Sequence, residues 1–137
     1  MSSFIQHTEA YESGMKNRRE VMGDSYVDAS LSKGASEFAS LGQQDATEFA
    51  WHNVWSRSGL DRKQRSLICL TLLTVLGKEK ELAGHVRGAI NNGLTPNELR
   101  EVFHQLMVYC GVPIGLEGFR IADAVLDQLQ KEGKLQA

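Results

Sequence analysis

The residues best suited to acid–base chemistry are a glutamate and a histidine four positions apart, Glu81 and His85. One helical turn separates them, so their side chains are neighbours on one flank of the expected helix. A carboxylate beside an imidazole stabilises the protonated ring and fixes its tautomer, which gives a proton donor near neutral pH. His85 also falls within the apolar face that Leu82, Val86 and Ala89 form, so a packed core histidine is the alternative.

Arg65 is a second candidate, because it lies in the first turn of an otherwise apolar segment. Its guanidinium could reach into a cavity and clamp a carboxylate with two hydrogen bonds. A solvated charge near the start of a helix explains it equally well. Tyr109 and Cys110 end a helix just before the turn "GVP", and His52 and His104 are expected on polar helix flanks at the surface.

Composition excludes several classes of protein. The 137 residues suit a single domain spanning 1–137, and 42% hydrophobic with 23% charged residues is ordinary for a globular protein. A net charge of −2 argues against a nucleic-acid partner. Cys69 and Cys110 lie far apart in apolar surroundings, so we expect two buried thiols, no disulfide framework and no metal site. The longest apolar run, "SLICLTLLTVLG", is too short to cross a membrane and the N-terminal segment does not resemble a signal peptide, so a cytoplasmic protein is expected.

The elements that must position these residues are all helical. Apolar spacing, glycine stops and N-caps predict helices over 9–22, 24–33, 43–55, 62–76, 78–91, 96–110 and 116–130. Thr95, Pro96 and Glu98 form a capping box before the sixth of these helices. The sequence therefore predicts a compact all-α subunit of about six to seven helices.

Two features predict that subunits pack together. The segment 62–76 is apolar nearly all round and is expected to be the central, buried helix. The aromatic edge of Phe49, Trp51 and Trp55 also calls for a partner surface. The alternative is that the other helices of the same chain enclose the central one.

Four segments carry a resemblance to a known family: "YESGMKNRREVMGDSYVDAS", "FAWHNVWSRSGLDRKQRSLI", "KEKELAGHVRGAINNGLTPNELREV" and "YCGVP". In this order they resemble the carboxymuconolactone decarboxylase family, especially its small stand-alone 4-carboxymuconolactone decarboxylases. The resemblance implies the alkylhydroperoxidase D-like helical fold, assembled into ring oligomers, commonly hexamers built from three dimers. It also implies a carboxy-lyase of aromatic catabolism that forms the β-ketoadipate enol-lactone on the protocatechuate branch.

The alkylhydroperoxidase D-like enzymes resemble the chain more loosely. Their peroxidase chemistry requires a C-x-x-C whose second cysteine lies four residues before the family histidine. Those positions are Lys78 and Glu81 here, so we expect no thiol-dependent peroxidase.

The implied reaction requires no cofactor, because the substrate's lactone ring accepts the electrons that the lost CO2 leaves behind. His85, oriented by Glu81, then suits protonation of the carbanion, and Arg65 suits anchoring of a carboxylate. The other candidate substrate contacts are Trp51, Tyr109, Cys110 and Arg120.

Two positions depart from the family pattern: Leu116 stands where an asparagine is usual and Arg120 where a histidine is usual. A related lyase or isomerase acting on another lactone or a polyketide-type acid is therefore an alternative. A non-catalytic helical oligomer, used as a scaffold or accessory subunit, would require neither Glu81 nor His85.

Overall fold

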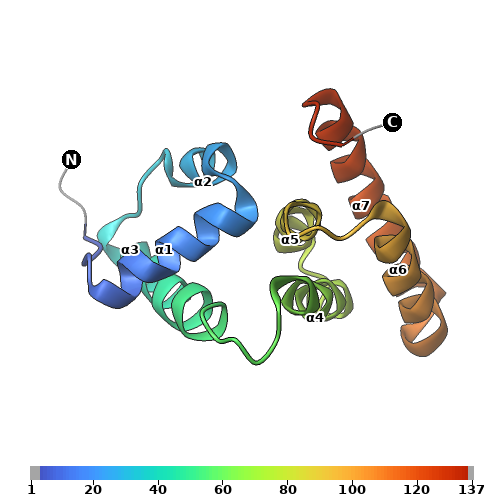
Figure 1. Cartoon of the computed structure of the whole chain (residues 1–137), viewed down its shortest axis with the longest axis horizontal. Helices are drawn as coiled ribbons and strands as arrows, with labels where there is room; N and C mark the ends of the chain where they lie inside the picture. The colour runs from blue at the N-terminus through green and yellow to red at the C-terminus, as the bar shows by residue number, and fades with distance from the viewer. Residues whose placement is uncertain (1–3, 136–137) are drawn as a thin grey trace. The chain divides into compact units, whose positions relative to one another are not determined.

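The computed structural model describes residues 4–135, and every regular element within this range is helical, which confirms the all-α prediction (Figure 1). The chain forms two compact units, residues 1–61 and 62–137. The single domain over 1–137 stays a prediction. No helix among the described residues is long and apolar enough to span a membrane.

Unit 1 is built from α1 (Glu9–Met22), α2 (Asp24–Leu31), α3 (Glu37–Asp45) and the π-helix η1 (Ala46–Val54). The side chain of Thr8 caps α1 by accepting a hydrogen bond from the Tyr11 amide, and Gly23, with φ of 91°, separates α1 from α2. Tyr11, Val21 and Val27 are buried. The packing of α1 on η1 is the main contact that holds this unit together.

The π-helix differs from the single α-helix predicted over 43–55. In η1 the hydrogen bonds skip an extra residue, as between the Trp55 amide and the Ala50 carbonyl at 3.2 Å. Asn17 of α1 donates to the Trp51 carbonyl and to the Ser56 hydroxyl, both at 2.8 Å. These tertiary hydrogen bonds satisfy polar groups at the end of η1, and local helix propensity contains no information about them.

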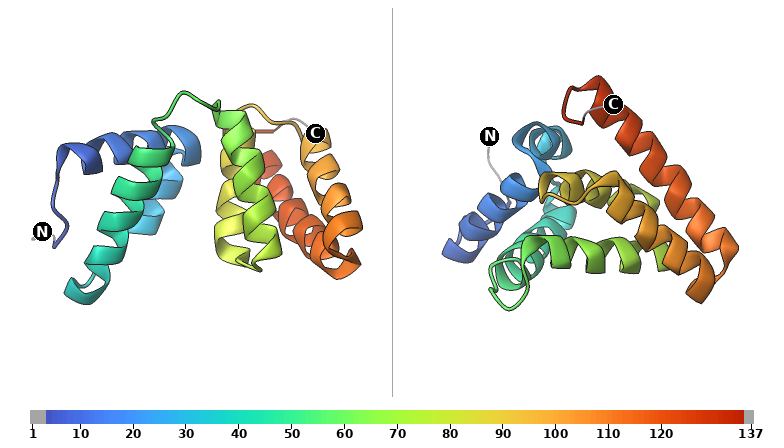
Figure 2. Two further views of the ribbon diagram at one scale, coloured as in Figure 1. Left: turned by 90° about the horizontal axis from the view of Figure 1, so that it is seen from below. Right: turned by 45° about the vertical axis from the view of Figure 1, so that its right-hand side comes forward.

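Unit 2 contains α4 (Arg62–Val75), α5 (Glu79–Asn91), α6 (Pro96–Cys110) and α7 (Val112–Lys131). The short turn around Gly77 folds α5 back along α4, and α7 folds back along α6 (Figure 2). The core is formed by one contiguous cluster of buried side chains: Leu70, Leu82, Val86, Ala89, Leu94, Leu99, Phe103, Leu106, Ile121 and Ala122. The helix α5, which carries Glu81 and His85, is therefore anchored along one face to a packed core.

The capping box at the start of α6 is confirmed: Thr95 and Glu98 exchange both hydrogen bonds. The last helix begins at Val112, four residues before its predicted start. Pro113 lies in its first turn, where the missing amide hydrogen costs nothing. Close packing explains the early start, because Gly115 lies directly against Met107 of α6.

Two predictions about buried surface are wrong for the chain taken alone. The helix α4 is not enclosed, because Ile68, Leu72 and Val75 are exposed on it. Conversely, Trp51 and Trp55 are only 9% and 7% exposed and stack on each other with ring centroids 5.2 Å apart. The two tryptophans therefore belong to the interior of the chain, and of the predicted aromatic edge only Phe49 is exposed.

An ion pair ties α5 to the end of α7. Arg87 Nη1 and Nη2 donate to the two carboxylate oxygens of Glu132 at 2.9 and 3.0 Å. Hydrogen bonds from Arg87, and further ones from Gln128 and Lys134, lower the pKa of Glu132 to about 2. The paired carboxylate therefore stabilises the fold at neutral pH.

We expect Glu132→Gln to lower the melting temperature at pH 7. The folded-state pKa lies below the ordinary value of about 4.3, so the stabilisation is present above pH 4–5 and is lost as the pH falls towards 2. The melting temperatures of the wild type and of Glu132→Gln should therefore converge as the pH falls through this window. Asp127→Asn, which removes an exposed i,i+4 pair with Lys131, is the control and should change the melting temperature little. A Glu132→Gln deficit that is constant from pH 7 to pH 2.5 would contradict this account.

Candidate functional site

The candidate acid lies in the middle of α5, a helix that contributes Leu82, Val86 and Ala89 to the core of unit 2. His85 is half-buried, and its Nδ1 atom is shielded from solvent. Glu81, one turn earlier, is exposed. This arrangement places an imidazole at the edge of the core, with a carboxylate on its solvent side.

The flank of α5 that carries His85 is turned towards α4. Asn92, at the end of α5, donates from Nδ2 to Ser66 Oγ at 2.9 Å and to the Arg62 carbonyl at 3.4 Å. His85 and Asn92 are seven residues, or about two turns, apart and so share a flank. Local helix signals in the sequence do not reveal this contact of Asn92 with the buried Ser66.

The protonation state of His85 differs from the prediction. Burial lowers the pKa of His85 below its ordinary value, and the charge of Glu81 raises it in part without reversing the shift. The free protein therefore holds a neutral imidazole at neutral pH. A ligand that brings negative charge next to the ring would raise the pKa of His85 again and so favour the protonated imidazole.

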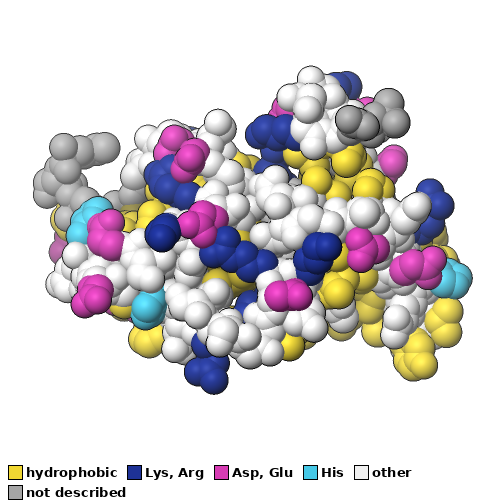
Figure 3. Space-filling model, in the orientation of Figure 1, with side chains coloured by type: hydrophobic (Ala, Val, Ile, Leu, Met, Phe, Trp, Pro, Cys, Tyr) yellow, Lys and Arg dark blue, Asp and Glu magenta, His cyan; other side chains and the backbone are white. Residues whose placement is uncertain are grey.

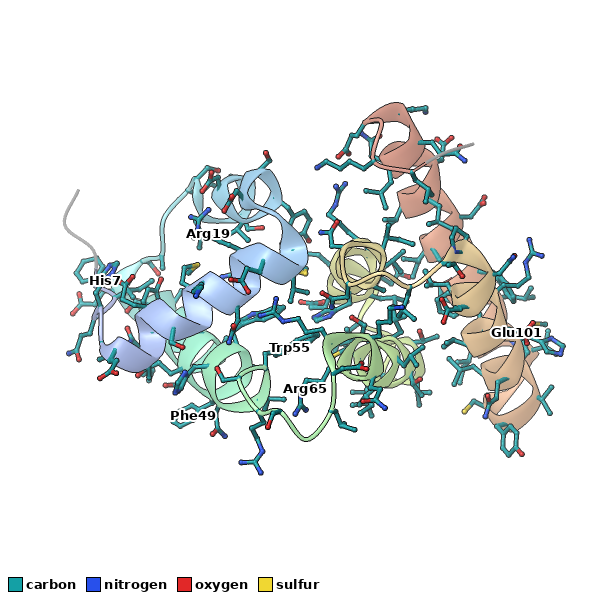
Figure 4. All side chains as sticks on the ribbon, in the orientation of Figure 1. His7, Arg19, Phe49, Trp55, Arg65 and Glu101 are labelled. Atoms are coloured by element: carbon teal, nitrogen blue, oxygen red, sulfur yellow. The ribbon has the colours of Figure 1, made fainter. Side chains whose placement is uncertain are left out.

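Arg65 is half-buried on α4, one position before Ser66, and its Nε atom is shielded from solvent (labelled in Figure 4). Because Ser66 contacts Asn92, Arg65 lies near the C-terminal end of α5. His85 is about 10 Å further back along that helix at 1.5 Å per residue. Long side chains can span much of such a separation. Unit 2 thus holds Arg65 near the C-terminal end of α5 and His85 about two turns before that end.

The cysteines do not behave as predicted. Cys69, one turn after Arg65, is half-buried, and burial raises the pKa of its thiol while the charge of Arg65 lowers it in part. Cys110 is exposed. The expectation of two buried thiols is therefore wrong for Cys110, which ends α6 beside Tyr109, a side chain that is 82% exposed.

Arg120 lies on a different side of α5 from His85. It donates to Glu117 at 2.7 Å and to Glu79 of α5 at 3.3 Å, and its side chain is 62% exposed. Glu79 precedes His85 by six residues, which corresponds to about 120° around the helix. Within unit 2 the structure does not bring Arg120 and His85 together. Leu116 is exposed as well.

The remaining candidate, Trp51, belongs to unit 1, where it is buried and stacks on Trp55. The structure thus brings Glu81 and His85 together and places Arg65 on the neighbouring helix. It places Tyr109 and Cys110 on an exposed end of unit 2. No group of three or more histidine, cysteine, aspartate or glutamate side chains within residues 4–135 is arranged to hold a metal ion.

Comparison with known proteins points in the same direction as the quoted motifs. The sequence pattern of the carboxymuconolactone decarboxylase family matches residues 42–124, which includes Glu81, His85 and Arg65. The chain is 41% identical to the nitrosuccinic acid decarboxylase npaB of Metarhizium robertsii over 128 residues, covering 93% of this chain and 89% of that protein. It is 37% identical to the 4-carboxymuconolactone decarboxylase of Acinetobacter baylyi over 121 residues, covering 88% and 90%.

These matches run through nearly the whole of two decarboxylases with different substrates, and the family pattern crosses from unit 1 into unit 2. The chain belongs to the carboxymuconolactone decarboxylase family and is a carbon–carbon lyase of the decarboxylase type.

Proposed function

We propose that the protein removes CO2, without a cofactor, from a dicarboxylic acid that carries its own electron sink. The observation that supports this most is the pairing of a half-buried histidine with a carboxylate on α5, in a chain whose two named relatives are decarboxylases. The first candidate substrate is 4-carboxymuconolactone, converted to the β-ketoadipate enol-lactone.

The chemistry requires three things of the protein. Loss of CO2 leaves an electron pair that the lactone carbonyl accepts through the ring double bond, so an oxyanion forms. One carboxylate has to be held throughout, for which Arg65 is the candidate. One proton has to reach carbon, for which His85 is the candidate. Because burial keeps free His85 neutral, we propose that the negative charge of the bound substrate raises its pKa and loads this proton.

A second candidate substrate is nitrosuccinic acid, because the relative that acts on it is 41% identical over 93% of the chain. Loss of the carboxylate on the nitro-bearing carbon leaves a nitronate, so the nitro group replaces the lactone as electron sink. Protonation of that carbon completes the reaction, with one carboxylate retained. The same three requirements apply, and the same residues meet them.

The test is direct incubation with each acid in D2O while CO2 release is measured and the product is followed by NMR. The proposal expects stoichiometric CO2 and one deuterium on the protonated carbon, with 4-carboxymuconolactone, nitrosuccinate or both. Metal chelators should have no effect. Inertness towards both acids would contradict the proposal.

We also propose that the protein assembles into a symmetric oligomer, with a hexamer of three dimers as the specific expectation. The support is an apolar surface on unit 2: Ile68, Leu72, Val75 and Leu76 of the α4 region are exposed, as are Val108, Tyr109, Val112 and Leu116. Figure 3 shows hydrophobic side chains at the surface where α6 gives way to α7. Large apolar side chains exposed in such number are typical of subunit interfaces. A cytoplasmic setting, in which Cys69 and Cys110 stay reduced, belongs to the same proposal.

We expect Leu72→Glu to dissociate this oligomer. Leu72 is 54% exposed in the single chain, so a charge there is tolerated by the subunit and excluded from an apolar interface. Light scattering at micromolar concentration should show a multimer for the wild type and a smaller particle for the variant. Phe38→Glu, which changes a 97% exposed side chain of unit 1, is the matched control and should leave the mass unchanged. A monomeric wild type would contradict the proposal.

A further inference from the structure

Unit 1 gives two adjacent arginines of α1, Arg18 and Arg19, very different hydrogen-bond partners. Arg19 pairs with Asp24 at 3.2 Å and with Asp28 at 2.8 Å, and these hydrogen bonds raise its pKa (labelled in Figure 4). Arg18 is half-buried and donates one hydrogen bond, from Nη1 to Gln43 Oε1, at 3.3 Å. Among the described residues no carboxylate forms an ion pair with Arg18, and burial lowers its pKa.

Gln43 Oε1 is the one hydrogen-bond acceptor that the described residues supply to Arg18. A guanidinium carries five N–H donors, of which the protein uses one here. Tyr11 and Tyr26 raise the pKa of Arg18 in part, and the neighbouring Arg19 lowers it. Burial raises the pKa of Tyr11, and the charge of Arg18 lowers it in part. Tyr11 is 5% exposed and Arg18 is half-buried, so the cation is partly withdrawn from water. A group made only of acceptors, such as a carboxylate, complements the unused N–H donors of this guanidinium.

Placing a cation there has a cost that the fold does not offset. Buried charges are normally paired, because removing them from water without a partner destabilises the folded state. The neighbouring Arg19 shows that α2 can supply carboxylates, yet none reaches Arg18. Places where a chain breaks such a rule without local compensation are typically functional.

We infer that Arg18 is an anion-binding residue whose guanidinium receives a carboxylate of the ligand. The inference rests on the proposed function for the identity of that ligand, a dicarboxylic substrate. Both candidate acids carry two carboxylates and keep one after CO2 is lost, so either acid offers the group that Arg18 would receive. Binding of the carboxylate would pair the charge of Arg18 and remove the destabilisation.

The test is a thermal shift of the full-length protein with succinate, a dicarboxylate that lacks an electron sink and so cannot be turned over in this way. Chloride at equal ionic strength is the reference. We expect succinate to raise the melting temperature of the wild type. Arg18→Met, which removes the charge but keeps most of the volume, should weaken succinate binding at least about tenfold. Without succinate its melting temperature should equal or exceed that of the wild type.

Arg19→Met is the matched control, since it changes the adjacent arginine whose carboxylate partners are known. It should lower the melting temperature in buffer and leave the response to succinate intact. Arg18→Lys keeps the charge without the two-pronged geometry and should bind succinate with intermediate strength. An equal response of the wild type to sulfate would overturn the carboxylate assignment in favour of an unselective anion site.

Three further results would overturn the inference: an unchanged succinate response in Arg18→Met, no response in the wild type, or an Arg18→Met protein that fails to fold. The last would show that the side chain has a structural role. The binding experiment does not depend on turnover. A protein that is inert towards both acids but loses succinate binding in Arg18→Met would therefore refute the proposed reaction and leave the anion site standing.

Discussion

His85→Ala is expected to lower kcat by at least about 10²-fold on whichever acid the protein decarboxylates, because general acid catalysis contributes roughly 10²- to 10⁴-fold. The fold should survive, since α5 is anchored through Leu82, Val86 and Ala89 and not through His85. Alanine is also the best helix former. Turnover per folded molecule and far-UV circular dichroism measured on the same preparation separate these effects. Normal turnover with a lowered melting temperature would assign His85 to the core instead.

The pH dependence gives the same assignment a second test. Since burial lowers the pKa of His85, kcat/KM should fall as the pH rises through a value below the ordinary 6.5. Glu81→Gln removes the charge that raises this pKa and should move the fall to still lower pH. The side chain of Glu81 is exposed, so the substitution should leave stability nearly unchanged. A profile that Glu81→Gln does not move would show that this carboxylate does not act on the catalytic acid.

The stability effect of His85 has the same direction as that of Glu132 but falls in a higher pH window. A histidine whose folded-state pKa is lowered binds its proton more readily in the unfolded chain. Stability is therefore lost as the pH falls from about 6.5 towards the lowered value. Glu132 contributes stability that is lost only at lower pH, towards 2. The two acid transitions should therefore be separable.

The ends of helices were predicted well where residues close in sequence determine them. The Thr95–Glu98 capping box and the glycine stop at Gly23 lie where the sequence places them, because a cap depends on residues three or four positions away. The same reasoning missed α3 and predicted η1 only as part of an α-helix over 43–55. A π-helix is stabilised by tertiary hydrogen bonds such as that from Asn17 to the Trp51 carbonyl, which join residues 34 positions apart.

The candidate site was predictable only in part, for an analogous reason. Helical spacing is enough to pair Glu81 with His85, but it cannot say which of two opposing influences on the histidine pKa is larger. Only the packing of α5 shows that burial prevails. Arg18 carries no sequence signal at all: "RR" looks like a solvated charge run, and the two arginines differ only in which carboxylates their surroundings supply.

The largest stability effect is expected from a residue that carries no chemistry. Gly14→Ala should destabilise the protein by about 3 kcal/mol or more, because overpacking a close contact typically costs about 1–3 kcal/mol and a contact with rigid backbone costs more. A Cβ at this position would lie 2.2 Å from the Thr47 carbonyl oxygen and 3.1 Å from the His52 amide nitrogen. Both atoms belong to the backbone of η1, so no rotamer change can relieve the overlap.

Gly42→Ala is the matched control, because Gly42 lies in the helix α3 of the same unit and a Cβ there would meet nothing within 4 Å. Alanine should stabilise that helix by roughly 0.5–1 kcal/mol. Urea denaturation of the full-length variants should therefore move the midpoint in opposite directions for the two changes. Equal stability of Gly14→Ala and wild type would mean that α1 does not pack on η1 at this point.

Gly14→Ala also tests how unit 1 contributes to function. The contact of Gly14 with Thr47 sets how closely α1 approaches η1, and these two helices carry Arg18 and Trp51 respectively. A variant that remains folded at low temperature should therefore lose affinity for succinate, even though His85 and Arg65 belong to the other unit and are unchanged. Retained succinate affinity in a folded Gly14→Ala protein would separate the position of α1 from anion binding.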